Sequence, residues 1–183
     1  MSSFIIILFI VISVLIYTIC GADTLTSMGV SSDSLWHCFI YQFSHASWLH
    51  MLLNMFAIGY MTSPIGKIWE RRFNNSAYSA IKILFAGYVS SVFAGAACAS
   101  AVPTVGSSGI AFFLLGVLLL LNPTLKQVQS YMWIAAAVAI QIYFGKSNTA
   151  LHLMCFVLGA LYTIVHEFIR QYKANVNRGI YQY

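Results

Sequence analysis

Charged residues are scarce in this sequence. Its 183 residues include 9 Lys and Arg and 4 Asp and Glu, so 7% are charged, whereas 60% are hydrophobic. A soluble domain carries about 25% charged residues, so this chain could not cover a water-facing surface and a soluble globular protein is excluded. The many apolar and aromatic residues also exclude intrinsic disorder. The composition and length predict one domain, residues 1–183, embedded in a lipid bilayer.

Several functional motifs are absent as well. The four cysteines form no CxxC pair and have no metal-ligand spacing with histidine. Neither a GxGxxG nor a P-loop pattern occurs, and basic residues are not interleaved with stacking aromatics as in nucleic-acid binders. The sequence therefore predicts no metal site and no nucleic-acid partner.

Apolar stretches long enough to cross about 30 Å of hydrocarbon as helices occur six times. The predicted spans are 4–20, 46–65, 77–101, 107–121, 130–144 and 150–169. The segment 21–44 is then a first extracytoplasmic loop, and 170–183 is a cytoplasmic tail. We expect an all-α membrane protein, a compact six-helix bundle. The first span is unsuited to a signal peptide, because it lacks a basic n-region and is long for the apolar region of one.

Basic residues fix the expected orientation, because they concentrate in cytoplasmic loops. With six spans, eight of the nine lie on one side, and Lys146 lies on the other; the eight are Lys67, Arg71, Arg72, Lys82, Lys126, Arg170, Lys173 and Arg178. Both termini are therefore predicted to be cytoplasmic. Cys20, Cys38 and Cys98 then fall toward the opposite side, where a disulfide among them stays open, and Cys155 is assigned to packing.

Polar residues inside membrane spans are costly, so each is a candidate functional residue. His50 and Asn54 are four residues apart and share one face of the second span. Ser108 opens the fourth span and His152 the sixth. Because these three spans all start on the outer side, the four side chains are expected to converge near that surface.

Serine and histidine together allow nucleophilic catalysis, since a serine hydroxyl needs a base to remove its proton. No Asp or Glu lies at this depth, so the pattern predicts a Ser-His dyad without a carboxylate. His50, Asn54 and the backbone N–H groups at the start of the fourth span could stabilise an oxyanion. Each residue also has a structural interpretation: Ser108 in packing, His152 at the interface, and His50 with Asn54 in interhelical hydrogen bonds.

Three motifs in this order resemble the rhomboid intramembrane serine proteases, over roughly residues 36–169. His45-Ala-Ser-Trp-Leu-His50-Met-Leu-Leu-Asn54 is similar to the family's H-x4-H-x3-N signature. Gly106-Ser107-Ser108-Gly109 resembles its G-x-S-G motif, and Ala150-Leu-His152 with Gly159 resembles the pattern of its sixth helix.

The resemblance implies a rhomboid-like bundle with Ser108 as nucleophile and His152 as general base, without metal or cofactor. It assigns His50 and Asn54 to oxyanion stabilisation and gives His45, Gly106, Gly109, Phe112 and Gly159 structural roles near the site. The implied activity is endoproteolysis in or near transmembrane helices of other membrane proteins. The alternative is an inactive relative that binds membrane clients. A transporter is disfavoured because paired charges and broken helices at the midplane are absent. The compact six-span layout favours a bacterial inner membrane, with an organelle membrane left open.

The sequence departs from the family pattern at three places. Cys155 stands where a glycine is usual, and Phe112 stands where a tyrosine is common and can still stack on His152. The first loop lacks the family's frequent Trp-Arg pair. We also expect Gln141 and the segment 144–148 to line a gate or cap over the site.

Overall fold

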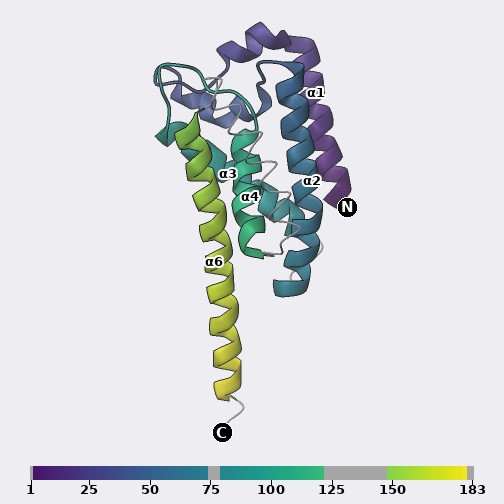
Figure 1. Ribbon diagram of the computed structural model, residues 1–183, viewed down its shortest axis with the longest axis vertical. Helices are drawn as coiled ribbons and strands as arrows, with labels where there is room; N and C mark the ends of the chain where they lie inside the picture. The colour runs from purple at the N-terminus through teal and green to yellow at the C-terminus, as the bar shows by residue number, and fades with distance from the viewer. Residues whose placement is uncertain (1, 74–78, 122–147, 181–183) are drawn as a thin grey trace.

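The computed structural model describes residues 2–73, 79–121 and 148–180, and these ranges are mainly helical (Figure 1). The elements are α1 (Ser2–Ser27), η1 (Leu35–Phe39), η2 (Tyr41–Phe43), α2 (Trp48–Phe73), α3 (Ser79–Ala97), α4 (Ser108–Leu121) and α6 (Thr149–Ile180). In these ranges there is no β-strand, only an isolated antiparallel bridge between Val30 and Thr104. The predicted all-α class is confirmed. The fifth span at 130–144 and Gln141 lie outside the described residues.

α1, α2 and α6 extend further than the apolar stretches that predicted them, whereas α3 and α4 lie within theirs. α1 continues through a kink at Gly21, whose φ of 72° is readily adopted by glycine, so the start of the segment 21–44 is helical. α6 continues to Ile180, so most of the predicted tail 170–183 is helical as well. Hydropathy indicates only the apolar part of a helix. The helix itself can continue into a polar segment, because its backbone hydrogen bonds do not depend on apolar side chains.

α4 lies at the centre of the described bundle. Of its 14 residues, 11 are buried, and among the described helices it packs most extensively on α6 and also contacts α2 and α3. Figure 1 shows α4 between α6 on one side and α2 on the other, with α1 beside α2. A helix that is apolar all round is expected in such a position. The central helix thus presents its first residue, Ser108, to the surrounding helices.

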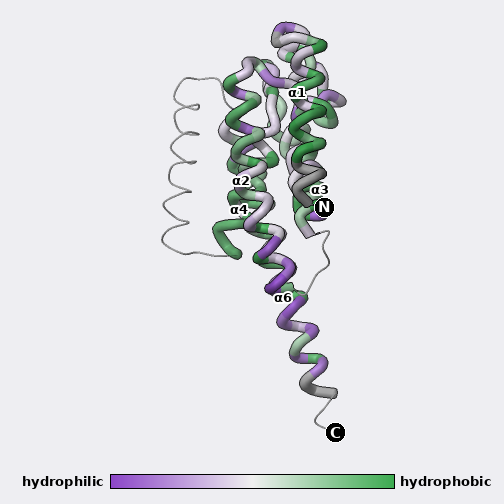
Figure 2. Tube along the Cα trace, turned by 90° about the vertical axis from the view of Figure 1, so that its right-hand side faces the viewer, coloured by the Kyte–Doolittle hydropathy of each residue, from purple (hydrophilic) through white to green (hydrophobic). Residues whose placement is uncertain are grey.

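The outward faces of the helices are apolar, as expected for a lipid-facing surface. Large side chains such as Ile19, Phe56, Phe93 and Phe168 are more than half exposed. In the described ranges, Ser79–Ala97 and Thr149–Asn177 are long and apolar enough to cross a membrane, and Ile7–Gly21 and Ser108–Leu121 are shorter apolar helices. Figure 2 shows that α6 becomes largely hydrophilic where it extends beyond the bundle.

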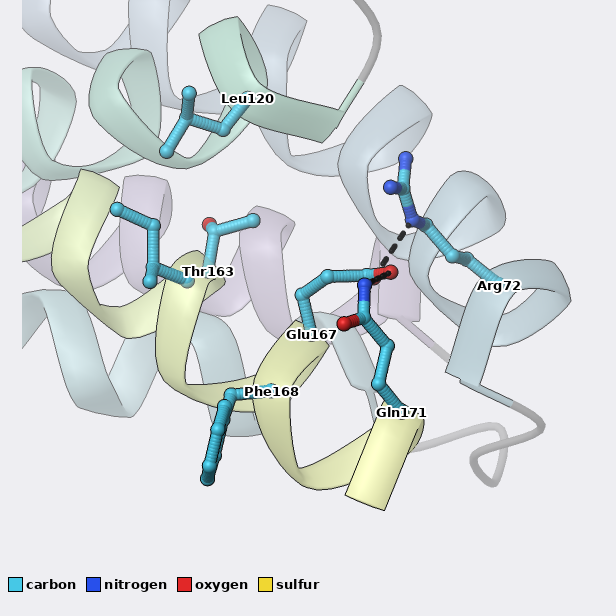
Figure 3. A pocket seen from close by; sticks show the side chains of 7 residues that line it. Arg72, Leu120, Thr163, Glu167, Phe168 and Gln171 are labelled. Carbon is cyan, nitrogen blue, oxygen red and sulfur yellow. Dashed lines mark hydrogen bonds and ion pairs between the residues drawn. The ribbon is translucent and has the colours of Figure 1, made fainter. Parts of the chain in front are cut away.

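A polar cluster joins three helices at the end of the bundle that lies away from Ser108. The guanidinium of Arg72 on α2 donates to Glu167 on α6 at 3.1 Å and to the carbonyl of Leu121 at the end of α4 at 3.0 Å. Glu167 also accepts from Arg170 and Gln171. Arg72, Glu167 and Gln171 border a cavity of about 360 Å³ that is otherwise lined by Leu120, Thr163, Ile164 and Phe168 (Figure 3). The cluster ties the carboxyl ends of α2 and α4 to α6.

Candidate active site

Ser108 and His152 meet at the amino-terminal ends of α4 and α6. The Oγ of Ser108 lies 2.7 Å from Nε2 of His152, within hydrogen-bond distance. Both side chains are buried, with 6% and 4% of their surface exposed. The carbonyl of Ser107 accepts the N–H groups of Ile110 and Ala111, and so begins α4 immediately before Ser108. The distance of 2.7 Å between Ser108 Oγ and His152 Nε2 is short enough for a general base to take a proton from a nucleophile.

His50 and Asn54 approach the same region from α2. Ser47 caps α2, because its Oγ accepts the N–H of His50 at 3.2 Å. A Cβ added to Gly106 would lie 2.9 Å from Nε2 of His50 and 3.1 Å from Nδ2 of Asn54. Gly106 also has a φ of 107°, which favours glycine. The loop before Ser108 therefore passes directly against the two polar side chains of α2.

Asn54 has a free hydrogen-bond donor at this point. Its Nδ2 is buried and makes no hydrogen bond within the described part of the chain. A buried donor without a partner is costly and needs an explanation. A reacting carbonyl oxygen beside Gly106 would supply the acceptor.

His45 is fully buried next to this group. Its Nδ1 donates to the carbonyl of Phe43 at 3.3 Å, so its Nε2 accepts from the hydroxyl of Ser107 at 3.4 Å. Burial, followed by the effect of His50, lowers the pKa of His45 to about 4, which keeps the ring neutral at pH 7. The hydrogen bond to His45 therefore attaches Ser107, the residue before Ser108, to the segment that leads into α2. The sequence does not predict this role of Ser107, because its partner His45 lies 62 residues away in the chain.

Glycines allow α4 and α6 to approach with their backbones in contact. A Cβ on Gly159 would lie 2.0 Å from the carbonyl oxygen of Phe113, and one on Gly116 would lie 2.1 Å from that of Phe156. A Cβ on Gly109 would meet Oγ of Ser91 at 2.4 Å. Gly116 was missed in the sequence, although it follows Gly109 by two helical turns and so lies on the same face.

Two of the three departures from the family pattern, Phe112 and Cys155, lie close to His152 or to the contact between α4 and α6. The ring of Phe112 is stacked on the imidazole, with centroids 4.5 Å apart and an interplanar angle of 14°. Cys155 is buried, and its Sγ lies 3.2 Å from the position of a Cβ on Gly109. The thiol therefore fits into the contact between α6 and α4, and the aromatic face against His152 needs no hydroxyl.

The first loop supports the site through Tyr41, which sequence reasoning also missed. The carbonyl of Tyr41 accepts the N–H of Gly106 at 2.9 Å, and its hydroxyl donates to the carbonyl of Ser91 on α3 at 2.9 Å. Burial raises the pKa of Tyr41, so the hydroxyl keeps its proton. Tyr41 thus connects α3 to the loop before Ser108.

In the part of the chain that the structure describes, the cysteines and other possible metal ligands form no further cluster. Cys20, Cys38, Cys98 and Cys155 are all free thiols. Within residues 2–73, 79–121 and 148–180, no group of three or more His, Cys, Asp or Glu side chains could hold a metal ion.

Comparison with known protein families identifies the family to which this chain belongs. The family model of the rhomboid domain matches residues 32–168, which is most of the chain. The chain belongs to the rhomboid family. A search of curated proteins and a search of solved structures each found no match. Rhomboids are membrane-embedded and are usually serine proteases, and inactive members exist, so the outward apolar surface is that of a membrane protein of this family.

Proposed function

We propose that this rhomboid is an active serine endopeptidase that hydrolyses peptide bonds in or near transmembrane helices of other membrane proteins. The observation that carries the proposal is the 2.7 Å contact between Ser108 Oγ and His152 Nε2 in a buried site. An inactive relative that only binds membrane clients has no need to keep this contact.

The reaction follows from the positions of these groups. Ser108 Oγ attacks the scissile carbonyl carbon while His152 Nε2 takes its proton, and the carbonyl π electrons move to the oxygen. His50, Asn54 Nδ2 and the N–H of Ser108 donate to that oxyanion, and the start of α4 adds the positive end of a helix dipole. His152 then gives its proton to the leaving amine, which breaks the C–N bond. Water, activated by the same histidine, releases the acyl group from Ser108.

The substrate would reach Ser108 from the bilayer. Peptide hydrolysis needs an extended peptide bond and water, so a substrate helix must unwind locally near the outer end of α4, and helix-breaking residues should favour cleavage. We place the protein in a bacterial inner membrane with six spans and both termini in the cytoplasm. Its partners are then transmembrane substrates within lipid, and the reaction uses no metal or cofactor.

The proposal is tested by cleavage of a transmembrane substrate in reconstituted vesicles. Ser108→Ala and His152→Ala should each abolish cleavage while leaving the unfolding temperature close to that of the wild type. Ser63→Ala, at an exposed position on α2, is the matched control and should cleave normally. Undiminished cleavage by Ser108→Ala would overturn the nucleophile assignment. A folded wild type that cleaves nothing would favour the inactive, client-binding alternative.

A further inference from the structure

The amino-terminal end of α6 is capped by Asn148. Its Oδ1 accepts the N–H of Leu151 at 3.1 Å, and its backbone carbonyl accepts the N–H of His152 at 3.2 Å. An N-cap side chain of this kind satisfies a donor that the first helical turn leaves without a partner. His152 is thus held in the turn that Asn148 starts.

The amide nitrogen of Asn148 points away from α6 to two other elements. Nδ2 donates to the carbonyl of Cys98, just after α3, at 2.9 Å and to Oγ1 of Thr104 at 3.2 Å. Thr104 lies four residues before Ser108, in the loop that leads to it. One side chain therefore joins the helix of the proposed base to the loop of the proposed nucleophile.

The backbone of Thr104 is held in place by hydrogen bonds of its own. It exchanges two backbone hydrogen bonds with Val30, both 2.9 Å long. Two residues further on, the N–H of Gly106 donates to the carbonyl of Tyr41. A side chain bonded to Thr104 is therefore held against the rest of the first loop.

The backbone-to-backbone contacts of Gly116 and Gly159 lie further along the helices, whereas at this end Gly109 of α4 packs only against side chains of α6, those of Leu151 and Cys155. Gly159 lies seven residues after His152, which is about 10 Å along a helix at a rise of 1.5 Å per residue. Helices that touch at Gly159 can still separate at their ends. The hydrogen bonds of Asn148 oppose such a separation at the level of the Ser108–His152 contact.

We propose that Asn148 is a positioning residue, which sets the distance between Ser108 Oγ and His152 Nε2 by tying the first turn of α6 to the loop before Ser108. The inference rests on the proposed protease function. Misplacement of a reacting group by about 1 Å can cost on the order of 10²-fold in rate, so losing the tie should lower kcat.

The test compares Asn148→Ala, Asn148→Asp and Asn175→Ala in reconstituted vesicles. The Asp variant keeps an oxygen that can cap Leu151 but loses both Nδ2 hydrogens, and Asn175 is exposed near the far end of the same helix. We expect kcat per active site, titrated with a serine-reactive probe, to fall at least about 10-fold in both Asn148 variants. KM should stay close to the wild-type value, and Asn175→Ala should match wild type in both constants.

Thr104→Val serves where an Asn148 variant does not fold, since it removes the Oγ1 acceptor and leaves the backbone pairing with Val30 intact. A smaller loss of kcat per active site is expected for it. Unchanged kcat per active site in the folded Asn148 variants, or full kcat in Asn148→Asp, would overturn the positioning role while the protease function stands. A folded wild type that neither cleaves nor reacts with the probe would instead overturn the proposed function on which the inference rests.

Discussion

Among the site residues, Asn54 has the surroundings that bear most directly on the proposed transition state. Its Nδ2 is buried with no hydrogen bond in the described part of the chain, next to the backbone of Gly106. Under the proposed function, a donor that lacks a partner in the free protein gains one when an oxyanion forms, and such a gain accelerates the chemical step rather than substrate binding.

We therefore predict that Asn54→Ala lowers kcat by about 10²–10³-fold, the cost of one oxyanion donor in other serine enzymes. The unfolding temperature should change little, because the Nδ2 group makes no hydrogen bond that the variant would lose. Kinetics in reconstituted vesicles and thermal unfolding check the two parts. A normal kcat would remove Asn54 from the oxyanion site, and a large loss of stability would assign it to packing.

The sequence could predict which residue types belong to the site but not how they are supported. Ser108, His152, His50 and Asn54 stand out because polar residues inside apolar spans are rare. Tyr41 and Asn148 lie in or near loops, where polar residues are ordinary, and their partners on or just after α3 and in the loop before Ser108 are 44 to 65 residues away in sequence. Contacts of this kind leave no periodic signal.

At the scale of elements, the close approach of α4 and α6 depends on Gly116 and Gly159. A Cβ on either glycine would lie far closer to a backbone carbonyl oxygen of the other helix than van der Waals contact allows. A helix backbone cannot move aside as a flexible side chain can, so an added methyl group must push the two helices apart.

We predict that Gly159→Ala and Gly116→Ala each lower the free energy of unfolding by about 1–3 kcal/mol, as overpacking does elsewhere, and also reduce cleavage. In the absence of the contact, alanine in place of glycine would stabilise a helix. Leu161→Ala, on the exposed face of α6, is the control and should have a smaller effect. Equal or greater stability of the two alanine variants in denaturant unfolding would show that the helices do not touch there.

Helix ends were the least predictable property of the elements. The apolar stretch 150–169 identified α6, yet the helix runs from Thr149 to Ile180, because the polar residues after 169 continue its backbone hydrogen bonds. Conversely, the pairing of Arg72 with Glu167 needs the packed arrangement of α2 and α6 to be known. In the sequence, the basic residues after the second span indicate the topology but do not identify Glu167 as a partner of Arg72.

At the scale of the whole molecule, charge still decides the expected orientation. Arg71 and Arg72 lie at the end of α2 that points away from Ser108, and Arg170 and Lys173 lie on the corresponding part of α6. The proposed site residues Ser108, His152, His50 and Asn54 include no Asp, Glu, Lys or Arg. The positive-inside rule then places Ser108 near the non-cytoplasmic surface.

This orientation predicts opposite labelling of two single-cysteine variants in a background without the four native cysteines. Val102→Cys, in the exposed loop between α3 and α4, should react with a membrane-impermeant maleimide on intact cells. Asn177→Cys, near the end of α6, should react only after the membrane is permeabilised. The reverse pattern would place the termini outside, and labelling of both sites on intact cells would contradict the span count.

The membership of the chain in the rhomboid family and its all-helical fold were both predictable from sequence, because apolar spans and short motifs are local features. The central claim that remains is that Ser108 is a nucleophile activated by His152. A fluorophosphonate probe reacts with such a serine, and mass spectrometry identifies the modified residue. The wild type should be labelled at Ser108, Ser108→Ala should not be labelled, and His152→Ala should react at least about 10²-fold more slowly, the usual contribution of a general base. A folded wild type that stays unlabelled, or is labelled equally fast without His152, would contradict the account.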